Sequence, residues 1–259
     1  MNSDQETAST DRGVAPQEGD GPERTGPTTS GPATTGASDI VPYVVPMVAY
    51  VALGSLESYL PSVSGHPSGV WYPLGYGARV VIVAALAWYF RATWRDFRPW
   101  PRLPTLALAV LLGLFVWALW VGLDGWYPSL PFLGKRVGFD MAALDPVARW
   151  FFIVIRMLGL VVLVPVIEEL FWRSFLIRWL ADPDFQKIPV GRVTLTAAGV
   201  TSIAFALVHP EWLPGLLTGA LWAWLLWRTK SLAACLVSHA VANLALGIYV
   251  IATGDWKYW

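Results

Sequence analysis

The residue types able to do chemistry gather in the hydrophobic C-terminal half of the sequence. They form three short patterns, EELFWR (168–173), FALVH (205–209) and HAVAN (239–243). Together these patterns hold carboxylates, a guanidinium, imidazoles and a carboxamide, which are groups that activate water and stabilise an oxyanion. Because glutamate and histidine are also zinc ligands, the residue types alone leave acid–base catalysis and metal binding open.

The two adjacent glutamates of the first pattern are expected to have different roles. Glu169 and Arg173 are four residues apart, so on a helix they share a face and can pair. Glu168 is rotated by about 100° from Glu169 and points to a different neighbour. We therefore expect Arg173 and Glu169 to support the helix and Glu168 to stay free for catalysis, since ionisable residues at membrane depth are functional by default. A structural clasp between helices is the alternative, above all for Glu169 and Arg173.

The two histidine patterns supply further groups on separate hydrophobic segments. Phe205 and His209 are four residues apart, and so are His239 and Asn243. A single histidine or asparagine in a membrane segment often serves only to join helices, but their occurrence together with Glu168 favours one common site. Phe205 is expected to pack. If the site binds a metal, Glu168, His209 and His239 are the candidate ligands and zinc is the candidate ion.

Three residues outside the patterns carry weaker signals. Arg156 precedes the glutamates and is expected either to pair with a carboxylate or to extend its charged end toward water. His66 stands in a loop rich in glycine, proline and serine and is expected at the surface. Cys235 is expected to be a small buried hydrophobic residue, and as the only cysteine it excludes a disulfide scaffold.

The elements that must position these residues follow from composition. The 259-residue chain is 55% hydrophobic and only 14% charged, against about 25% charged in a typical soluble domain. So few charges cannot cover the surface of a soluble fold of this length. The formal net charge is zero, so no basic footprint for nucleic acid is apparent. The sequence therefore predicts an all-α fold, a polytopic membrane bundle of about seven to eight transmembrane helices with a polar intramembrane active-site cavity.

Hydrophobic stretches separated by breakers mark the predicted helices. The segments run over about 41–60, 77–90, 105–123, 149–180, 193–208, 213–227 and 232–253, and the fourth is long enough to be split. The loop after the second segment carries Arg91, Arg95, Arg98 and Arg102, which predicts a cytoplasmic N-terminus and an external C-terminus.

The hairpin that holds His209 is short for two complete crossings. From Arg192 to Arg228 the chain has 37 residues, whereas two spans need about 40 plus a turn. The breakers of HPEWLPG (209–215) stand in its middle. We therefore expect the tip with His209 to lie inside the membrane region, against protein or a wet cavity, and the cavity to open toward the cytoplasm.

Three regions are predicted along the chain: a disordered acidic low-complexity leader (1–39), N-terminal transmembrane helices and loops (40–147), and a catalytic helical core (148–259). The leader has seven acidic and two basic residues and no Leu, Ile, Phe, Trp or Tyr, so it cannot bury enough apolar surface to order. It also lacks the basic and apolar regions of a signal peptide.

The three patterns, in this order on successive hydrophobic segments, resemble the CPBP family, which includes the type II CAAX prenyl endopeptidases and the Abi-type bacterial proteins. The stretch AFALVHPEWLPGLLTGALWAWL (204–225) with GIYVIATGDW (247–256) is more narrowly similar to bacterial CAAX prenyl protease-related proteins that accompany exosortase/PEP-CTERM sorting systems. This resemblance implies a multi-pass protein of the bacterial plasma membrane. It also implies a protease whose partners are the lipid bilayer and a membrane-associated peptide or protein substrate.

The resemblance also implies roles for the pattern residues. Glu168 would be the general base that activates water, and His209 would assist at that water. His239 and Asn243 would stabilise the tetrahedral oxyanion. Glu169 and Arg173 would support the helix. The family is often called a metalloprotease, yet this chain has no HExxH pattern, so the metal requirement stays open.

Two other hypotheses compete with an intramembrane endopeptidase. One is a non-catalytic membrane scaffold or immunity-type protein that uses the polar cluster to join helices. The other is a small transporter with Glu168 as proton carrier. The sequence disfavours the transporter because the first three hydrophobic segments hold almost no ionisable residue to continue a proton path.

Overall fold

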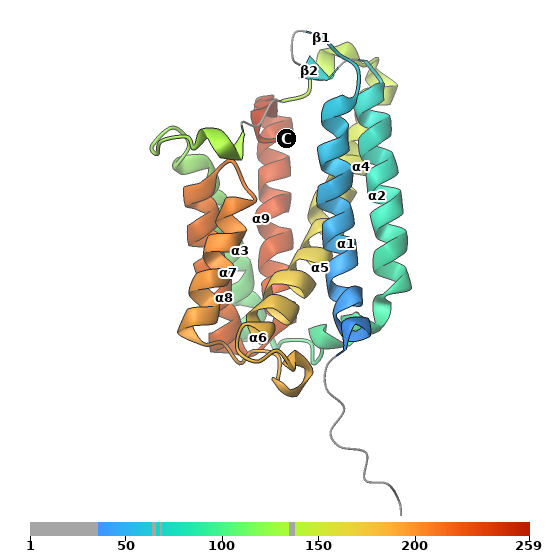
Figure 1. Ribbon diagram of the computed structural model, residues 1–259. Coiled ribbons are helices and arrows are strands. Elements are labelled where there is room, and N and C mark those ends of the chain that lie inside the picture. The colour runs from blue at the N-terminus through green and yellow to red at the C-terminus, as the bar shows by residue number, and fades with distance from the viewer. Residues whose placement is uncertain (1–35, 64–65, 68, 135–137) are drawn as a thin grey trace, which may run out of the picture. The chain divides into compact units, whose positions relative to one another are not determined.

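The described part of the chain is a bundle of long helices (Figure 1). A computed structural model describes residues 36–63, 66–67, 69–134 and 138–259. The only strands in these residues are β1 (Ser62–Val63) and β2 (His66–Pro67), which pair antiparallel. The predicted all-α class is confirmed. Most of the predicted acidic leader falls on residues 1–35, outside the described residues.

Seven hydrophobic helical segments follow one another in the described part of the chain. They are α1 (Ala37–Leu56), α2 (Trp71–Tyr89), α3 (Leu103–Gly122), a continuous helix over Pro146–Trp179, α7 (Leu195–Leu207), α8 (Trp212–Thr229) and α9 (Leu232–Thr253). Short 3₁₀ turns stand between them: η1 (Glu57–Tyr59), η2 (Arg91–Phe97), η3 (Pro131–Leu133), η4 (Met141–Ala143) and η7 (Phe185–Lys187). A further 3₁₀ turn, η8 (Trp256–Tyr258), follows α9. Each hydrophobic helix lies near a segment expected from the sequence.

Four of the described helices are long and apolar enough to cross a membrane: α1, α3, the helix over Pro146–Trp179 and α9. Counting α2 with η2, from which it is bent by 76°, makes five. The protein is therefore a multi-pass membrane protein. The hairpin helices α7 and α8 complete the set of seven. With 13 residues, α7 extends about 20 Å, which is shorter than the bilayer's hydrocarbon core of about 30 Å.

The helix over Pro146–Trp179, here called the motif helix, contains two π-helical stretches. It begins at Asp145, whose side chain accepts the backbone N–H groups of Val147 and Ala148. It then runs through α4 (Pro146–Leu158), the π-helical η5 (Gly159–Leu163), α5 (Val164–Glu168), the π-helical η6 (Glu169–Leu176) and α6 (Ile177–Trp179). Pro165 has no N–H to close an α-helical turn, and η5 ends two residues before it. π-Helical turns inside α-helices are frequent at functional sites.

The two helices of the hairpin, α7 and α8, pack closely against each other. Gly219 of α8 lies so near α7 that a Cβ atom there would stand 2.8 Å from the Cα of Ser202, a close approach that only glycine allows. In Figure 1 the upper ends of α7 and α8 stop below those of α1, α2 and α9. The hairpin therefore places the turn that follows α7 within the height of the bundle.

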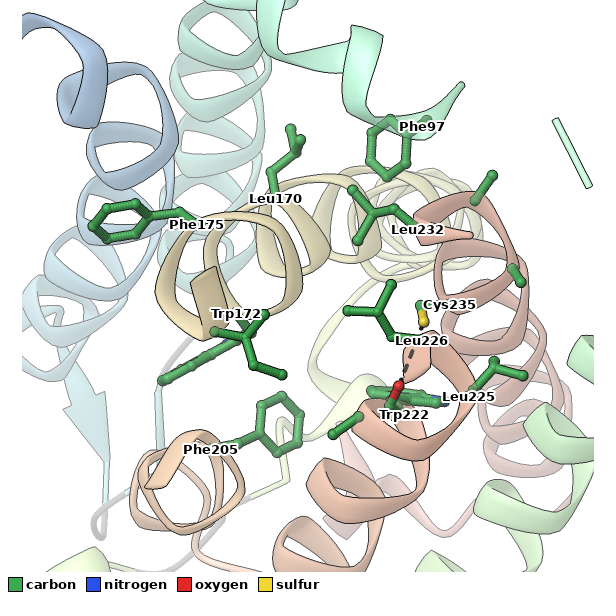
Figure 2. Packing of buried hydrophobic residues seen from close by; sticks show 14 of the residues in the cluster. Phe97, Leu170, Trp172, Phe175, Phe205, Trp222, Leu225, Leu226, Leu232 and Cys235 are labelled. Carbon is green, nitrogen blue, oxygen red and sulfur yellow. Dashed lines mark hydrogen bonds between the residues drawn. The ribbon is translucent and has the colours of Figure 1, made fainter. Parts of the chain in front are cut away.

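Aromatic side chains fill the space between the motif helix and the hairpin. Figure 2 shows Trp172 of the motif helix, Phe205 of α7 and Trp222 of α8 in one buried cluster. The ring of Phe205 lies 5.7 Å from that of Trp172 and 6.0 Å from that of Trp222. Cys235 of α9 is fully buried, as expected, and its thiol contacts the Trp222 carbonyl oxygen at 3.5 Å. This packing fixes the positions of the motif helix, α7, α8 and α9 along one another, and with them the positions of their polar residues.

Candidate active site

The four residues predicted to carry chemistry line one cavity of about 260 Å³. Glu168 comes from the motif helix, His209 from the turn after α7, and His239 and Asn243 from α9. Side chains of α1, α3 and α8 close the remaining walls. Residues up to 75 positions apart in the sequence thus face the same space, which is the arrangement the sequence analysis required.

Glu169 joins two of the three patterns. Its Oε1 atom accepts a hydrogen bond from Nδ1 of His239 at 2.8 Å and pairs with Nη1 of Arg173 at 3.4 Å. The side chain of Glu169 is 0% exposed. The pair with Arg173 is the one expected from their spacing, but the contact with His239 was not predicted. Because a carboxylate only accepts hydrogen bonds, Nδ1 of His239 carries the proton, and Nε2 is the ring nitrogen left for chemistry.

Aromatic rings hold this polar group from the other side. The guanidinium carbon of Arg173 lies 4.6 Å from the ring centre of Phe205 and 4.9 Å from that of Trp222. The imidazole of His239 stacks on Trp222 with ring centres 4.2 Å apart. Trp222 in turn donates its indole N–H to Ser238 Oγ at 3.0 Å. Sequence reasoning missed Trp222 because it is one of 16 tryptophans and belongs to no pattern.

Glu168 differs from Glu169 in its surroundings. It is 7% exposed and lines the cavity, and its Oε2 atom has no hydrogen-bond partner among the described residues. Buried polar atoms in folded proteins are nearly always hydrogen-bonded, so an exception needs a reason. Oε2 of Glu169 also has no partner, but of the two glutamates only Glu168 lines the cavity, so its carboxylate is the one suited to bind water or substrate.

His209 and Asn243 are oriented by backbone carbonyls. Nδ1 of His209 lies 2.7 Å from the carbonyl oxygen of Phe205, one helical turn earlier. Nδ2 of Asn243 donates to the carbonyl oxygen of Leu160 at 2.7 Å. Leu160 belongs to η5, so the π-helical turn meets the side chain of Asn243. The amide nitrogen of Asn243 carries a second N–H beyond this bond.

Metal binding was the alternative that the residue types left open. Among the described residues, no group of three or more His, Cys, Asp or Glu side chains is arranged to hold a metal ion. The candidate ligand set of Glu168, His209 and His239 therefore does not fit zinc in this geometry.

Arg156 takes neither of the two positions expected for it. Its guanidinium is surrounded by aromatic rings, including that of Tyr76 at 4.8 Å and that of Trp259 at 5.7 Å. It donates to the hydroxyl oxygen of Tyr72 at 2.8 Å. With 7% of its surface exposed, it does not reach water, and no described carboxylate pairs with it. Ring faces stabilise the charge here, which sequence spacing does not reveal.

The fold and the cavity define a class of protein, a multi-pass helical membrane protein with a carboxylate, two imidazoles and a carboxamide around one partly open cavity. Residues 149–245 match the model of the family described as "Type II CAAX prenyl endopeptidase Rce1-like". This stretch holds all three patterns, and its match to the family model confirms the resemblance to the CPBP family. No curated protein and no solved structure matches the chain.

Proposed function

We propose that the protein is a glutamate-dependent intramembrane endopeptidase that hydrolyses a peptide bond in a membrane-associated peptide or protein. The observation that carries this proposal is the cavity that Glu168, His209, His239 and Asn243 share. The family match of residues 149–245 supports a protease of the CAAX type.

In the proposed reaction Glu168 takes a proton from a water molecule in the cavity. Its Oε2 atom has no protein hydrogen bond to lose. His209 orients the same water as its oxygen attacks the carbonyl carbon of the peptide bond. The protonated Glu168 then passes the proton to the amide nitrogen as the C–N bond breaks, which yields a carboxylate and a free amine.

In the proposed reaction His239 and Asn243 stabilise the oxyanion of the tetrahedral intermediate. They stand four residues apart on α9 and both line the cavity. The carboxylate of Glu169 accepts a hydrogen bond from Nδ1 of His239 at 2.8 Å and so fixes the orientation of the imidazole ring. An imidazole donates to an oxyanion from Nε2 when that nitrogen carries a proton, and preorganised donors contribute about 3–4 kcal/mol each to hydrolases.

The test is cleavage of membrane-embedded peptides by the purified protein with Glu168→Gln in parallel. Glu168→Gln preserves the shape of the side chain and removes the base, so we expect cleavage to fall at least a hundredfold with an unchanged melting temperature. Cleavage that survives the substitution contradicts the assignment. The narrower resemblance to exosortase-associated proteins makes membrane-anchored proteins of such a sorting pathway the first substrates to try.

The clasp of Glu169, Arg173 and His239 favours the scaffold hypothesis as the second candidate, because such a buried cluster can join helices without catalysis. A scaffold predicts no cleavage by either protein and a lower melting temperature for Glu168→Gln. The same experiment therefore separates the two functions.

A further inference from the structure

A segment far from the cavity carries an unusual concentration of charge. The chain leaves α2 and turns through 76° into η2 (Arg91–Phe97), then continues to Arg102 before α3 begins. Figure 1 shows this stretch at the lower end of the bundle, the end where α1 begins. We call residues 91–102 the arginine segment. Because of the bend, η2 runs across the end of the bundle instead of along it.

One face of the arginine segment is fastened to the bundle. Thr93 and Phe97 are buried. Asp96 accepts hydrogen bonds from Tyr43 of α1 at 2.9 Å and from Nη2 of Arg178 of the motif helix at 2.8 Å. These contacts hold η2 in place, and the ion pair with Arg178 balances the negative charge of Asp96.

The opposite face presents only positive charge. The side chains of Arg91, Arg95, Arg98 and Arg102 are exposed. Arg95 approaches a carboxylate, that of Asp96, only at 3.9 Å. The other three arginines have no ion pair among the described residues. Three of the four guanidinium groups therefore lack an acidic partner among the described residues, and the fourth shares Asp96 with Arg178.

Tryptophans surround these arginines and shape the surface between them. Trp88, Trp94 and Trp100 line an open hollow together with Arg91, Arg95 and other residues of the segment. The guanidinium of Arg91 lies over the ring of Trp88 at 5.2 Å and donates to the Trp88 carbonyl oxygen at 3.1 Å. Trp88 and Trp100 are largely exposed. Exposed indole rings beside arginines suit the boundary between hydrocarbon and headgroups.

We propose that the arginine segment binds the headgroup of an anionic phospholipid. Guanidinium groups bind phosphate oxygens in a bidentate geometry, and basic clusters directly beside a transmembrane helix bind anionic lipid. A lipid is favoured over a soluble anion because the hollow lies at the end of a membrane-spanning helix and is walled by interfacial tryptophans. This site is independent of the proposed protease activity.

The test counts lipid bound to the purified full-length protein by native mass spectrometry, in micelles doped with phosphatidylglycerol or with phosphatidylcholine. Arg95→Gln/Arg98→Gln is compared with the control Arg192→Gln/Arg228→Gln, which removes two exposed arginines outside the segment. We expect affinity for phosphatidylglycerol to fall about fivefold for each arginine removed from the segment, with little change in the control. Phosphatidylcholine should bind weakly to every protein.

Two results would overturn the proposal. Equal loss in both double variants would show diffuse attraction to surface charge instead of a site. Equal protection of the melting temperature by inorganic phosphate and by phosphatidylglycerol would assign the arginines to a soluble anion. If Arg95→Gln/Arg98→Gln does not fold in phosphatidylcholine micelles, Arg91→Gln/Arg102→Gln answers the same question, because both substituted side chains are exposed.

Discussion

The same substitution at the two adjacent glutamates should have opposite effects. Glu169→Gln removes the negative charge that pairs with Arg173 and His239 inside the bundle. Breaking a buried pair costs about 3–5 kcal/mol because it leaves an uncompensated charge. The rings on either side of Arg173 stabilise the remaining cation, so we expect the lower figure, about 3 kcal/mol. Glu168→Gln breaks no hydrogen bond at Oε2 and should not lower stability.

The assay is thermal unfolding of the full chain in detergent, followed by near-UV circular dichroism. At about 2–4 °C per kcal/mol for a domain of this size, Glu169→Gln should melt about 6–12 °C below the wild type. Glu168→Gln should melt with the wild type and lose cleavage. The two variants differ by one position and have identical chemistry, so each is the control for the other.

A double-mutant cycle checks the cause of the destabilisation. Arg173→Met removes the cation, and we expect Glu169→Gln/Arg173→Met to be at least about 2 kcal/mol more stable than the two single effects would give by addition. Additive effects would refute the pairing of Glu169 with Arg173. A fall in the melting temperature of Glu168→Gln as large as that of Glu169→Gln would refute the division of roles between the glutamates.

Three further predictions concern the surroundings of the site. Trp222→Leu removes the ring stacked on His239 and should reduce the cleavage rate at least tenfold and shift the pH profile of cleavage. Trp222→Phe keeps an aromatic ring and should retain most activity. Equal rates for the two variants would show that the stack is dispensable. Gly219→Ala should cost about 1–3 kcal/mol in thermal unfolding, because its Cβ would force α7 and α8 apart, and an unchanged melting temperature would contradict that close approach. The hydrogen bond from Lys257 lowers the pKa of Asp124. This pair therefore stabilises the fold above the unfolded-state pKa of Asp124, near 4, and its contribution disappears as the pH falls through the lower folded-state value. Both side chains are exposed, Lys257 to 51% and Asp124 to 39%, which limits the effect to about 1 kcal/mol or less, and Asp124→Asn should remove this contribution from the acid-dependent change in melting temperature.

The helices were predictable because their signals are local. The last segment was expected at 232–253, and α9 spans the same residues. The first was expected at 41–60 but begins at Ala37, because the carboxylate of Asp39 accepts the N–H of Gly36 and starts the helix inside the polar leader. The second was expected to begin at Gly77 but begins at Trp71, because Pro73 stands in the first turn, where a missing N–H costs nothing.

The residue types and the spacing within each pattern were enough to nominate Glu168, His209, His239 and Asn243. They also predicted the pair of Glu169 with Arg173, because four residues on one helix is a local distance. In this respect the sequence by itself determined the helices, their order and the groups available for chemistry.

Only the tertiary structure decided which of these groups touch. The bond between Glu169 and His239 joins residues 70 positions apart, and the stack of Trp222 on His239 joins α8 to α9. Both depend on how far each helix slides and rotates against its neighbours. That register is set by the summed packing of many side chains, among them the close approach of α7 and α8 at Gly219 and the π-helical turns of the motif helix, and no single stretch of sequence contains it.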